Sequence, residues 1–300
     1  MSDKRQIIRN RNGLLVRAPA KINLSLLIAG KRPDGFHEIE TVMAKVNWYD
    51  EILIQQCRKA GIELVCKGPC WAPVGRENLI YQAAELILKS CGAQANLKLT
   101  LTKNIPAGSG LGSASSDAVA TLIGLNQYLK LDLKNKDLTE LAAQLGSDVP
   151  FFLNGPLAFC AGKGEKVKKL SRKFNFLALL ILPDVSVSTR KAYADYKHNA
   201  ALYEKLSAQI NDYIRKNRID LVAKMCANML QTSCFGLVKC LAKLKAKIES
   251  LGIGPLCLSG SGSAMFCIID GRDRQTARAY RDKLNKKLGC RSIIVSNNRW

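Results

Sequence analysis

The chain has 300 residues, of which 47% are hydrophobic and 23% charged, a balance typical of globular proteins that excludes a disordered or fibrous chain. Lys and Arg outnumber Asp and Glu by 46 to 24, so the net charge is +22, which favours anionic ligands, whether nucleotides, nucleic acids or simple ions. No segment approaches the roughly 18 consecutive apolar residues of a membrane span, and the first residues lack the apolar core of a secretory signal. We therefore expect a soluble, cytoplasmic protein.

Apolar patterns in the first half of the chain predict strands and helices in mixed order. Gly92 and Gly146 mark helix ends, and the sequence RPDG marks a turn because Pro presets φ and Gly admits positive φ. The predicted elements are two short strands within 14–30 joined at Pro19, a turn over 32–35, a helix over 79–90, a strand over 96–102, a helix with its apolar face at Ala118, Leu122, Leu125 and Leu129, and a helix over 138–145.

The pattern changes from about residue 171, and the expected boundary lies in the Gly- and Lys-rich stretch 161–173. The elements predicted beyond it are a buried strand over 176–182, helices near 190–214, 219–231 and 237–251, a strand, glycine turn and strand across 256–269, a basic helix near 274–288 and a final strand over 292–296. This order of elements indicates a two-domain α+β protein.

The eleven cysteines are scattered and include no Cys-x-x-Cys pair. Only His37 and His198 are available to complete a zinc set, and neither stands at a useful spacing. We therefore expect reduced, mostly buried thiols that pack as small hydrophobic side chains.

The most informative segment is a glycine-rich loop, IPAGSGLGSASSDAV at 105–119, between a predicted strand and a predicted helix. Its glycines let backbone amides approach a ligand closely, its serines add hydroxyl donors, and the following helix directs free N–H groups and its positive dipole end at the loop. This combination binds phosphate. The structural alternative is a flexible turn capped by Ser116 or Asp117. Neither a Walker A ending nor the acidic residue of a Rossmann unit accompanies the loop.

Three segments in the right order resemble the GHMP kinase superfamily, which includes galactokinase, homoserine kinase, mevalonate kinase and phosphomevalonate kinase. The loop resembles the phosphate loop of that superfamily, APAKINLSLLIAG at 18–30 its N-terminal motif, and LCLSGSGSAMF at 256–266 its C-terminal glycine-rich motif. RPDGFHEIET at 32–41 and GSDVPFF at 146–152 are together similar to the 4-diphosphocytidyl-2-C-methyl-D-erythritol kinases within the superfamily.

The resemblance implies an N-terminal ribosomal-protein-S5-domain-2-like α/β domain over 1–165 and a C-terminal ferredoxin-like domain over 166–300, with the active site between them. It implies transfer of the γ-phosphate of ATP, with Mg²⁺ as cofactor, to the 2-hydroxyl of 4-diphosphocytidyl-2-C-methyl-D-erythritol in the non-mevalonate (MEP) isoprenoid pathway. The alternatives are another GHMP kinase, of homoserine or mevalonate type, and a charge-driven RNA-binding protein. We expect a monomer or homodimer that binds neither nucleic acid nor membrane, since the basic helices lack groove-reading elements and interleaved aromatics.

Asp148 and Lys21 are the catalytic candidates. On residue type alone, Asp148 is a turn residue before a proline and Lys21 a solvated strand-edge residue. The resemblance implies instead that Asp148 orients the substrate hydroxyl or accepts its proton, and that the Lys21 ammonium pairs with Asp148. Asn23 lies on the same strand face as Lys21 by the period of two, and the resemblance implies that it contacts the substrate.

The resemblance also supplies the remaining site residues. His37, which on residue type alone is structural, is implied to hydrogen-bond a cytosine that lies between Phe36 and Tyr193, with Thr189 near the phosphates. The residues of the C-terminal glycine motif assigned to the substrate are Gly260, Ser261 and Gly262. The residues assigned to the ATP phosphates are Pro106, Ala107, Gly108, Ser109, Gly110, Leu111, Gly112, Ser113, Ala114, Ser115 and Ser116.

The sequence departs from the family pattern at two places. Ser109, Ser113 and Ala114 stand in a loop that is usually richer in glycine. Phe36 stands where the family usually has Tyr, which removes a phenolic hydroxyl but keeps a stacking face.

Overall fold

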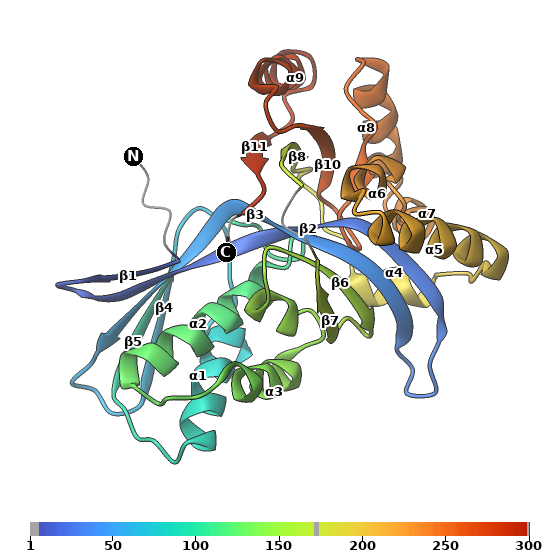
Figure 1. Ribbon diagram of the computed structural model, residues 1–300. Helices are drawn as coiled ribbons and strands as arrows, with labels where there is room; N and C mark the ends of the chain where they lie inside the picture. The colour runs from blue at the N-terminus through green and yellow to red at the C-terminus, as the bar shows by residue number, and fades with distance from the viewer. Residues whose placement is uncertain (1–5, 171–173, 299) are drawn as a thin grey trace.

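The computed structural model describes residues 6–170, 174–298 and 300, which form two β-sheets with helices around them (Figure 1). The larger sheet has the order β1-β2-β3-β5-β4, with β6 paired to β3 and β7 to β6. Its strands are β1 (Ile7–Asn10), β2 (Gly13–Lys31), β3 (His37–Gln56), β4 (Ile62–Lys67), β5 (Leu97–Thr102), β6 (Leu157–Gly162) and β7 (Lys166–Lys169). β4 and β5 are parallel, and every other pair in this sheet is antiparallel.

The prediction of two short strands joined at Pro19 was wrong. β2 is continuous, and its register with β3 shifts between Pro19 and Ala20, where an irregularity accommodates the proline. β1 pairs only with residues 13–16 of β2, so beyond that point one edge of β2 is open to other partners. The glycine-rich loop uses this edge, because the Lys21 amide donates to the carbonyl of Leu111 at 2.9 Å. The predicted turn at 32–35 is confirmed, with Gly35 at φ +83°.

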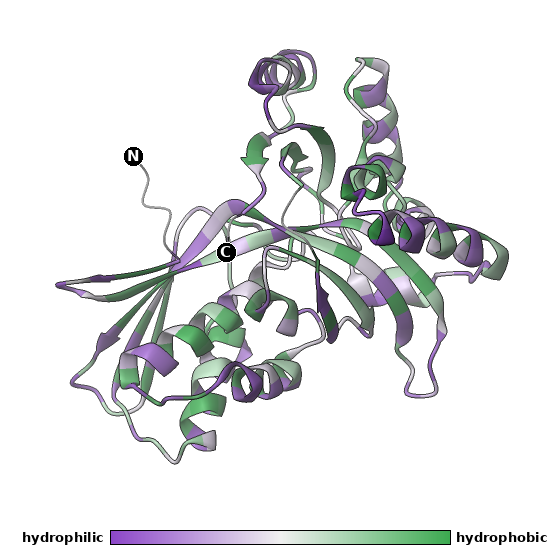
Figure 2. Ribbon diagram, in the orientation of Figure 1, coloured by the Kyte–Doolittle hydropathy of each residue, from purple (hydrophilic) through white to green (hydrophobic). Residues whose placement is uncertain are grey.

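Three helices, α1 (Leu79–Ser90), α2 (Ser113–Leu129) and α3 (Asn135–Leu145), lie on one side of the long β2–β3 pair (Figure 1). α1 and α2 are largely hydrophobic (Figure 2) and bury apolar side chains against Leu14, Val16, Ile52 and Ile54 of the sheet. The predicted α1 is confirmed: Asn78 caps its first turn by accepting from the Ile80 amide at 2.9 Å. α3 begins three residues before the predicted start. Two short 3-10 turns, Gly75–Glu77 and Pro150–Leu153, complete this half.

The smaller sheet contains β8 (Phe176–Ile181), β9 (Cys257–Leu258), β10 (Met265–Asp270) and β11 (Ser292–Ser296) in the order β11-β8-β10-β9. All its pairings are antiparallel. β8, its first strand in the sequence, lies beside β11, its last, which is the strand order of a ferredoxin-like sheet. Its helices are α4 (Thr189–Ala194), α5 (Ala200–Arg215), α6 (Ile219–Met225), α7 (Gln231–Leu237), α8 (Lys239–Ser250) and α9 (Arg274–Leu288). The largely hydrophilic α9 and the strand β11 have the predicted bounds (Figure 2).

Two predicted helices in this half have different limits. The segment near 190–214 is two helices, because Asn199 caps a new helix by accepting from the Leu202 amide at 2.9 Å. The helix predicted to reach residue 231 ends at Met225, where Cys226 adopts a left-handed backbone with φ +46°. The described helices include none long and apolar enough to cross a bilayer.

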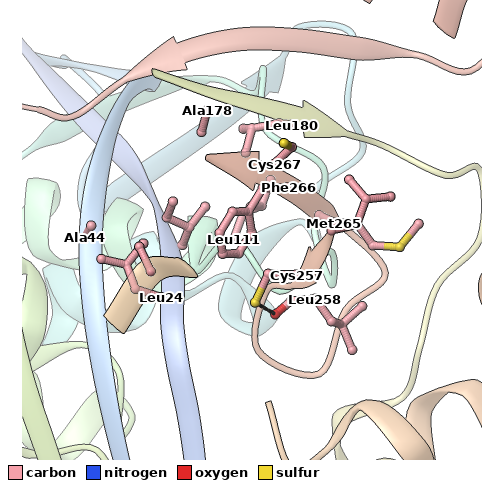
Figure 3. Packing of buried hydrophobic residues seen from close by; sticks show 14 of the residues in the cluster. Leu24, Ala44, Leu111, Ala178, Leu180, Cys257, Leu258, Met265, Phe266 and Cys267 are labelled. Carbon is pink, nitrogen blue, oxygen red and sulfur yellow. Dashed lines mark hydrogen bonds between the residues drawn. The ribbon is translucent and has the colours of Figure 1, made fainter. Parts of the chain in front are cut away.

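The hydrophobic core of the second half includes residues of the first. Leu24 and Ala44, from β2 and β3, pack in the same cluster as Ala178, Leu180 and Phe266 of the smaller sheet (Figure 3). The β2–β3 pair is therefore covered on both faces, by α1–α3 on one side and by the smaller sheet with its helices on the other (Figure 1).

All eleven cysteines lie in the described part of the chain and are free thiols, as expected. The expectation that most are buried was wrong, since burial is complete only for Cys160, Cys234, Cys257 and Cys267. Cys240 is exposed and the other six are half-buried, because they lie near element ends rather than on core faces.

Candidate active site

The glycine-rich loop connects β5 to α2 and meets a second glycine-rich loop from between β9 and β10. Gly110, with φ +79°, has no room for a side chain, because a Cβ there would lie 2.0 Å from the carbonyl oxygen of Ser259. The Ser259 hydroxyl donates to the Gly110 carbonyl at 2.9 Å, and the Ala264 amide donates to the Ser109 carbonyl at 3.0 Å. Backbone-to-backbone packing thus holds the two loops together.

α2 begins directly after the loop with Gly112 as its capping residue, and no side chain caps it among the described residues. The alternative that Ser116 or Asp117 caps a flexible turn was wrong, since both lie inside the helix and Ser116 donates its own amide to the Gly112 carbonyl at 3.0 Å. The amides of the first turn, at Ser113, Ala114 and Ser115, therefore remain available for an anion.

Lys21 and Asp148 form an ion pair beside the loop, with Lys21 Nζ 3.4 Å from Asp148 Oδ2. The Lys21 side chain is 4% exposed and that of Asp148 36%, so the solvated strand-edge reading of Lys21 was wrong. Lys21 Nζ also donates to Asn23 Oδ1 at 2.5 Å, and the Asn23 amide group donates in turn to Thr41 Oγ1 at 2.8 Å. Gly112 packs against the Lys21 stem, since a Cβ on Gly112 would lie 2.9 Å from Lys21 Cγ.

The second glycine-rich loop borders this ion pair. A Cβ on Gly260 would lie 3.2 Å from Asn23 Oδ1 and 3.4 Å from Lys21 Nζ. Ser261 Oγ lies 2.7 Å from the hydroxyl of Thr189, the first residue of α4. Gly262, the third residue assigned here, has φ +80° and packs against Leu258. The structure therefore brings both glycine-rich loops, the Lys21–Asp148 pair, Asn23 and Thr189 to one place.

An aromatic group lies at the end of the β2–β3 pair where the hairpin turns, since Lys31 pairs with His37 there. His37 packs against Tyr193 with ring centroids 5.2 Å apart and against the edge of Tyr196 at 6.0 Å. Burial, with the neighbouring charges of Lys31 and His198, lowers the pKa of His37 and so favours a neutral imidazole. Phe36 is 55% exposed, and the ammonium of Lys163 lies 4.8 Å above its ring.

Sequence reasoning missed three features of this region. Tyr196 and Lys163 contact His37 and Phe36 only through the tertiary fold, and no local pattern marks them. The third is a cleft of about 840 Å³ on the far side of the phosphate loop. Its lining residues are Cys70, Trp71, Pro106, Ala107, Gly108, Ser109, Leu182, Pro183, Asp184, Val185, Ser186, Ser263, Ala264, Gly289, Cys290 and Arg291. Trp71 at this cleft is 75% exposed, which only the folded structure shows.

Comparison with known protein families gives two matches in the expected order. Residues 78–156 match the family described as GHMP kinases N terminal domain, and residues 210–289 match the family described as GHMP kinases C terminal. The first match contains the phosphate loop and Asp148.

Individual relatives extend the likeness over most of the chain. A 4-diphosphocytidyl-2-C-methyl-D-erythritol kinase of Bacillus cereus is 33% identical over 89% of this chain and 91% of its own length. The enzyme of the same name from Clostridium botulinum is 31% identical over 91% of this chain and 96% of its own length. A crystal structure of 4-(cytidine 5'-diphospho)-2C-methyl-D-erythritol kinase superposes with a TM-score of 0.73 and 29% identity, covering 95% of this chain and all of the other. Homoserine kinase from Cytophaga hutchinsonii superposes with a TM-score of 0.75 at 21% identity, covering 100% of this chain and 98% of the other, and shows the shared fold alone.

Proposed function

This chain belongs to the GHMP kinases and, within them, to the 4-diphosphocytidyl-2-C-methyl-D-erythritol kinase family, and from this premise we propose that it transfers the γ-phosphate of ATP to the 2-hydroxyl of 4-diphosphocytidyl-2-C-methyl-D-erythritol. One observation of the structure carries the proposal: the ion pair of the buried Lys21 with the partly exposed Asp148 lies beside a loop built to bind phosphate. The larger sheet ends with β7 (Lys166–Lys169) and the smaller one begins with β8 (Phe176–Ile181), so we place the division between the two kinase domains between residues 169 and 176 and not at the expected 165/166.

Asp148 is assigned to the acceptor hydroxyl. Its carboxylate is partly exposed while its partner Lys21 is buried, so the carboxylate is the member of the pair that an incoming hydroxyl can reach. A hydrogen bond from the hydroxyl to Asp148 orients the hydroxyl oxygen for in-line attack on the γ-phosphorus. The Asp148 carboxylate accepts the hydroxyl proton as the new O–P bond forms and the bond to ADP breaks. Lys21, held by Asn23, fixes the position of the Asp148 carboxylate through the ion pair.

The phosphate loop and the cleft beside it are assigned to ATP. The free amides at the start of α2 suit a triphosphate, and the cleft, with Trp71 at its side, suits the adenosine. Mg²⁺ is the expected counter-ion. The described residues contain no group of three or more His, Cys, Asp or Glu able to hold a metal.

The protein oxygen that we assign to this Mg²⁺ is the hydroxyl of Ser116. It is buried and has no hydrogen-bond partner among the described residues. When bound, the ion would neutralise charge on the transferring phosphate.

The aromatic group is assigned to the cytosine of the acceptor. A neutral His37 can donate one hydrogen bond and accept another, which suits the edge of a pyrimidine. Tyr193 and the exposed ring of Phe36 offer stacking faces. Location in the cytoplasm and a monomeric or homodimeric state stay predictions.

A panel of acceptors tests the proposal. Production of ADP is measured with the diphosphocytidyl substrate, homoserine and mevalonate, each with the wild-type protein and with Asp148→Asn as the control for background hydrolysis. We expect turnover with the diphosphocytidyl substrate alone. Turnover of homoserine or mevalonate without the first substrate would place the activity elsewhere in the superfamily. Turnover that is insensitive to salt also argues against the RNA-binding alternative, whose affinity would fall steeply with ionic strength.

A further inference from the structure

A buried ionic cluster lies at the base of the phosphate loop and takes no part in the chemistry described above. Lys103 Nζ lies 2.6 Å from Asp50 Oδ2 and 2.5 Å from Asp117 Oδ2. The three side chains are at most 4% exposed. Asp50 belongs to β3, Lys103 follows β5 directly, and Asp117 lies in the first half of α2. The cluster therefore connects the segment before the loop, the helix after it and a strand beneath both.

Asp50 also holds the backbone where the loop begins. Its Oδ1 accepts hydrogen bonds from the amides of Asn104 at 2.6 Å and Ile105 at 2.9 Å. The Asn104 side chain donates to the carbonyl of Tyr49, the neighbour of Asp50 in β3, at 2.9 Å. The start of the loop is thus fixed to β3, and its other end is fixed to the same point through Lys103 and Asp117.

Stability alone does not account for this cluster. Buried ion pairs are often no more stabilising than apolar side chains of similar volume, because desolvation offsets the attraction. Here two carboxyl groups share one ammonium, and Oδ1 of Asp117 is buried without a hydrogen-bond partner among the described residues. The arrangement thus maintains a fixed geometry at an energetic cost.

We propose that Lys103, Asp50 and Asp117 are positioning residues that hold the two ends of the phosphate loop at the separation required to bind the triphosphate of ATP. The inference rests on the proposed function, since it takes the loop to be the ATP site. The cluster acts through the backbone of the loop and not by touching substrate. Breaking the connection at Asp117 therefore weakens nucleotide binding and leaves binding of the acceptor unchanged.

Two substitutions at Asp117 separate geometry from stability. Asp117→Ala cuts the connection to α2 but leaves Lys103 paired with Asp50, so the remaining buried charges balance. Asp117→Asn keeps the size of the side chain and an oxygen that can face Lys103. The matched control is Thr121→Val, because Thr121 is buried one turn later on α2 and donates to the Asp117 carbonyl at 2.8 Å without touching the cluster's side chains.

The dissociation constant of ATP is measured by calorimetry without acceptor, together with KM for each substrate and the melting temperature. We expect Asp117→Ala to weaken ATP binding about tenfold or more, with KM for the acceptor unchanged and with ATP binding near wild type in Asp117→Asn and Thr121→Val. The inference is overturned if Asp117→Ala lowers the melting temperature as Thr121→Val does but binds ATP normally. If the wild type binds ATP yet phosphorylates no diphosphocytidyl acceptor, the kinase proposal fails while this test of the loop still stands.

Discussion

Replacing Gly110 by Ala adds one methyl group where the two glycine-rich loops meet. Gly110 and Gly108 both have a left-handed backbone, with φ of +79° and +68°, so Ala at either position costs roughly 1–2 kcal/mol of backbone strain. Their surroundings differ. A Cβ on Gly110 would lie 2.0 Å from the Ser259 carbonyl oxygen, whereas nothing lies within 4 Å of a Cβ on Gly108. Gly108→Ala is therefore the matched control for backbone strain.

The size of the additional effect follows from the contacts between the loops. Real Cβ atoms keep at least 3.0 Å from such an oxygen, so the loops must separate by about 1 Å in Gly110→Ala. The bonds from Ser259 Oγ to the Gly110 carbonyl, now 2.9 Å, and from the Ala264 amide to the Ser109 carbonyl, now 3.0 Å, would then exceed hydrogen-bonding distance. Each contributes roughly 0.5–1.5 kcal/mol. Gly110→Ala should thus be less stable than Gly108→Ala by about 1–3 kcal/mol.

Urea unfolding of both variants, followed by circular dichroism, measures this difference as a difference in the free energy of unfolding. Equal values for the two variants would refute the reasoning, because they would show that the loops separate without loss of the two hydrogen bonds. ATP binding gives a second measure. A separated loop must be drawn back on binding, so Gly110→Ala should also bind ATP more weakly than Gly108→Ala, by about tenfold for each 1.4 kcal/mol.

Three further predictions concern the ion pair, the buried cluster and the thiols. Asp148→Asn should lower kcat by about 10²–10⁴-fold with little change in ATP binding, and Lys21→Met should also lower kcat. The double variant should lose less than the product of the single losses, because both residues act on one oxygen. Near-normal kcat in Asp148→Asn would contradict the catalytic role. Burial, partly opposed by Lys103, raises the pKa of Asp117 from the usual 3.8 to about 8. The folded state therefore binds the carboxyl proton more tightly than the unfolded state, and the free energy of unfolding should fall as pH rises between those values. Urea titrations at several pH values should show a shallower fall of the free energy of unfolding in Asp117→Asn than in the wild type, and equal slopes would argue against ionisation of Asp117. Iodoacetamide, with the sites read by mass spectrometry, should modify the exposed Cys240 first and the four buried thiols, Cys160, Cys234, Cys257 and Cys267, last. Their burial limits access, and it also raises the pKa of Cys234 and of Cys267 to about 12. Early labelling of Cys234 would contradict its burial.

An element could be predicted from the sequence where its ends and its hydrophobic period are marked by nearby residues. α1, with a capping Asn78 and a following glycine, and α9 both carry such signals. β3 was not predicted, because its central residues from Thr41 to Val46 are all buried and show no alternation of apolar and polar side chains. The central residues of β3 are covered on both faces by elements from distant parts of the chain, so their burial follows only from the tertiary fold. The shorter strands β1, β4, β6 and β7 were not predicted either.

The same distinction holds for the site. The phosphate loop is contiguous, so its glycines and serines could be assigned from sequence, and Lys21, Asn23 and Asp148 followed from their motifs. The cluster of Asp50 and Lys103, 53 residues apart, has no local pattern. Tyr196 and Trp71 are likewise ordinary aromatic residues until the chain folds, since their neighbours in space are distant in sequence.

The double coverage of the β2–β3 pair has a consequence for synthesis of the chain on the ribosome. Leu24 and Ala44 belong to a cluster whose other members extend as far as Val295, more than 250 residues later in the sequence. Until that segment leaves the exit tunnel, the nascent first half presents a row of uncovered aliphatic side chains on a long sheet. Such a surface is a binding site for chaperones and a starting point for aggregation. For the same reason, a fragment ending near residue 165 should be poorly soluble by itself and should recover when the second half is supplied as a separate chain.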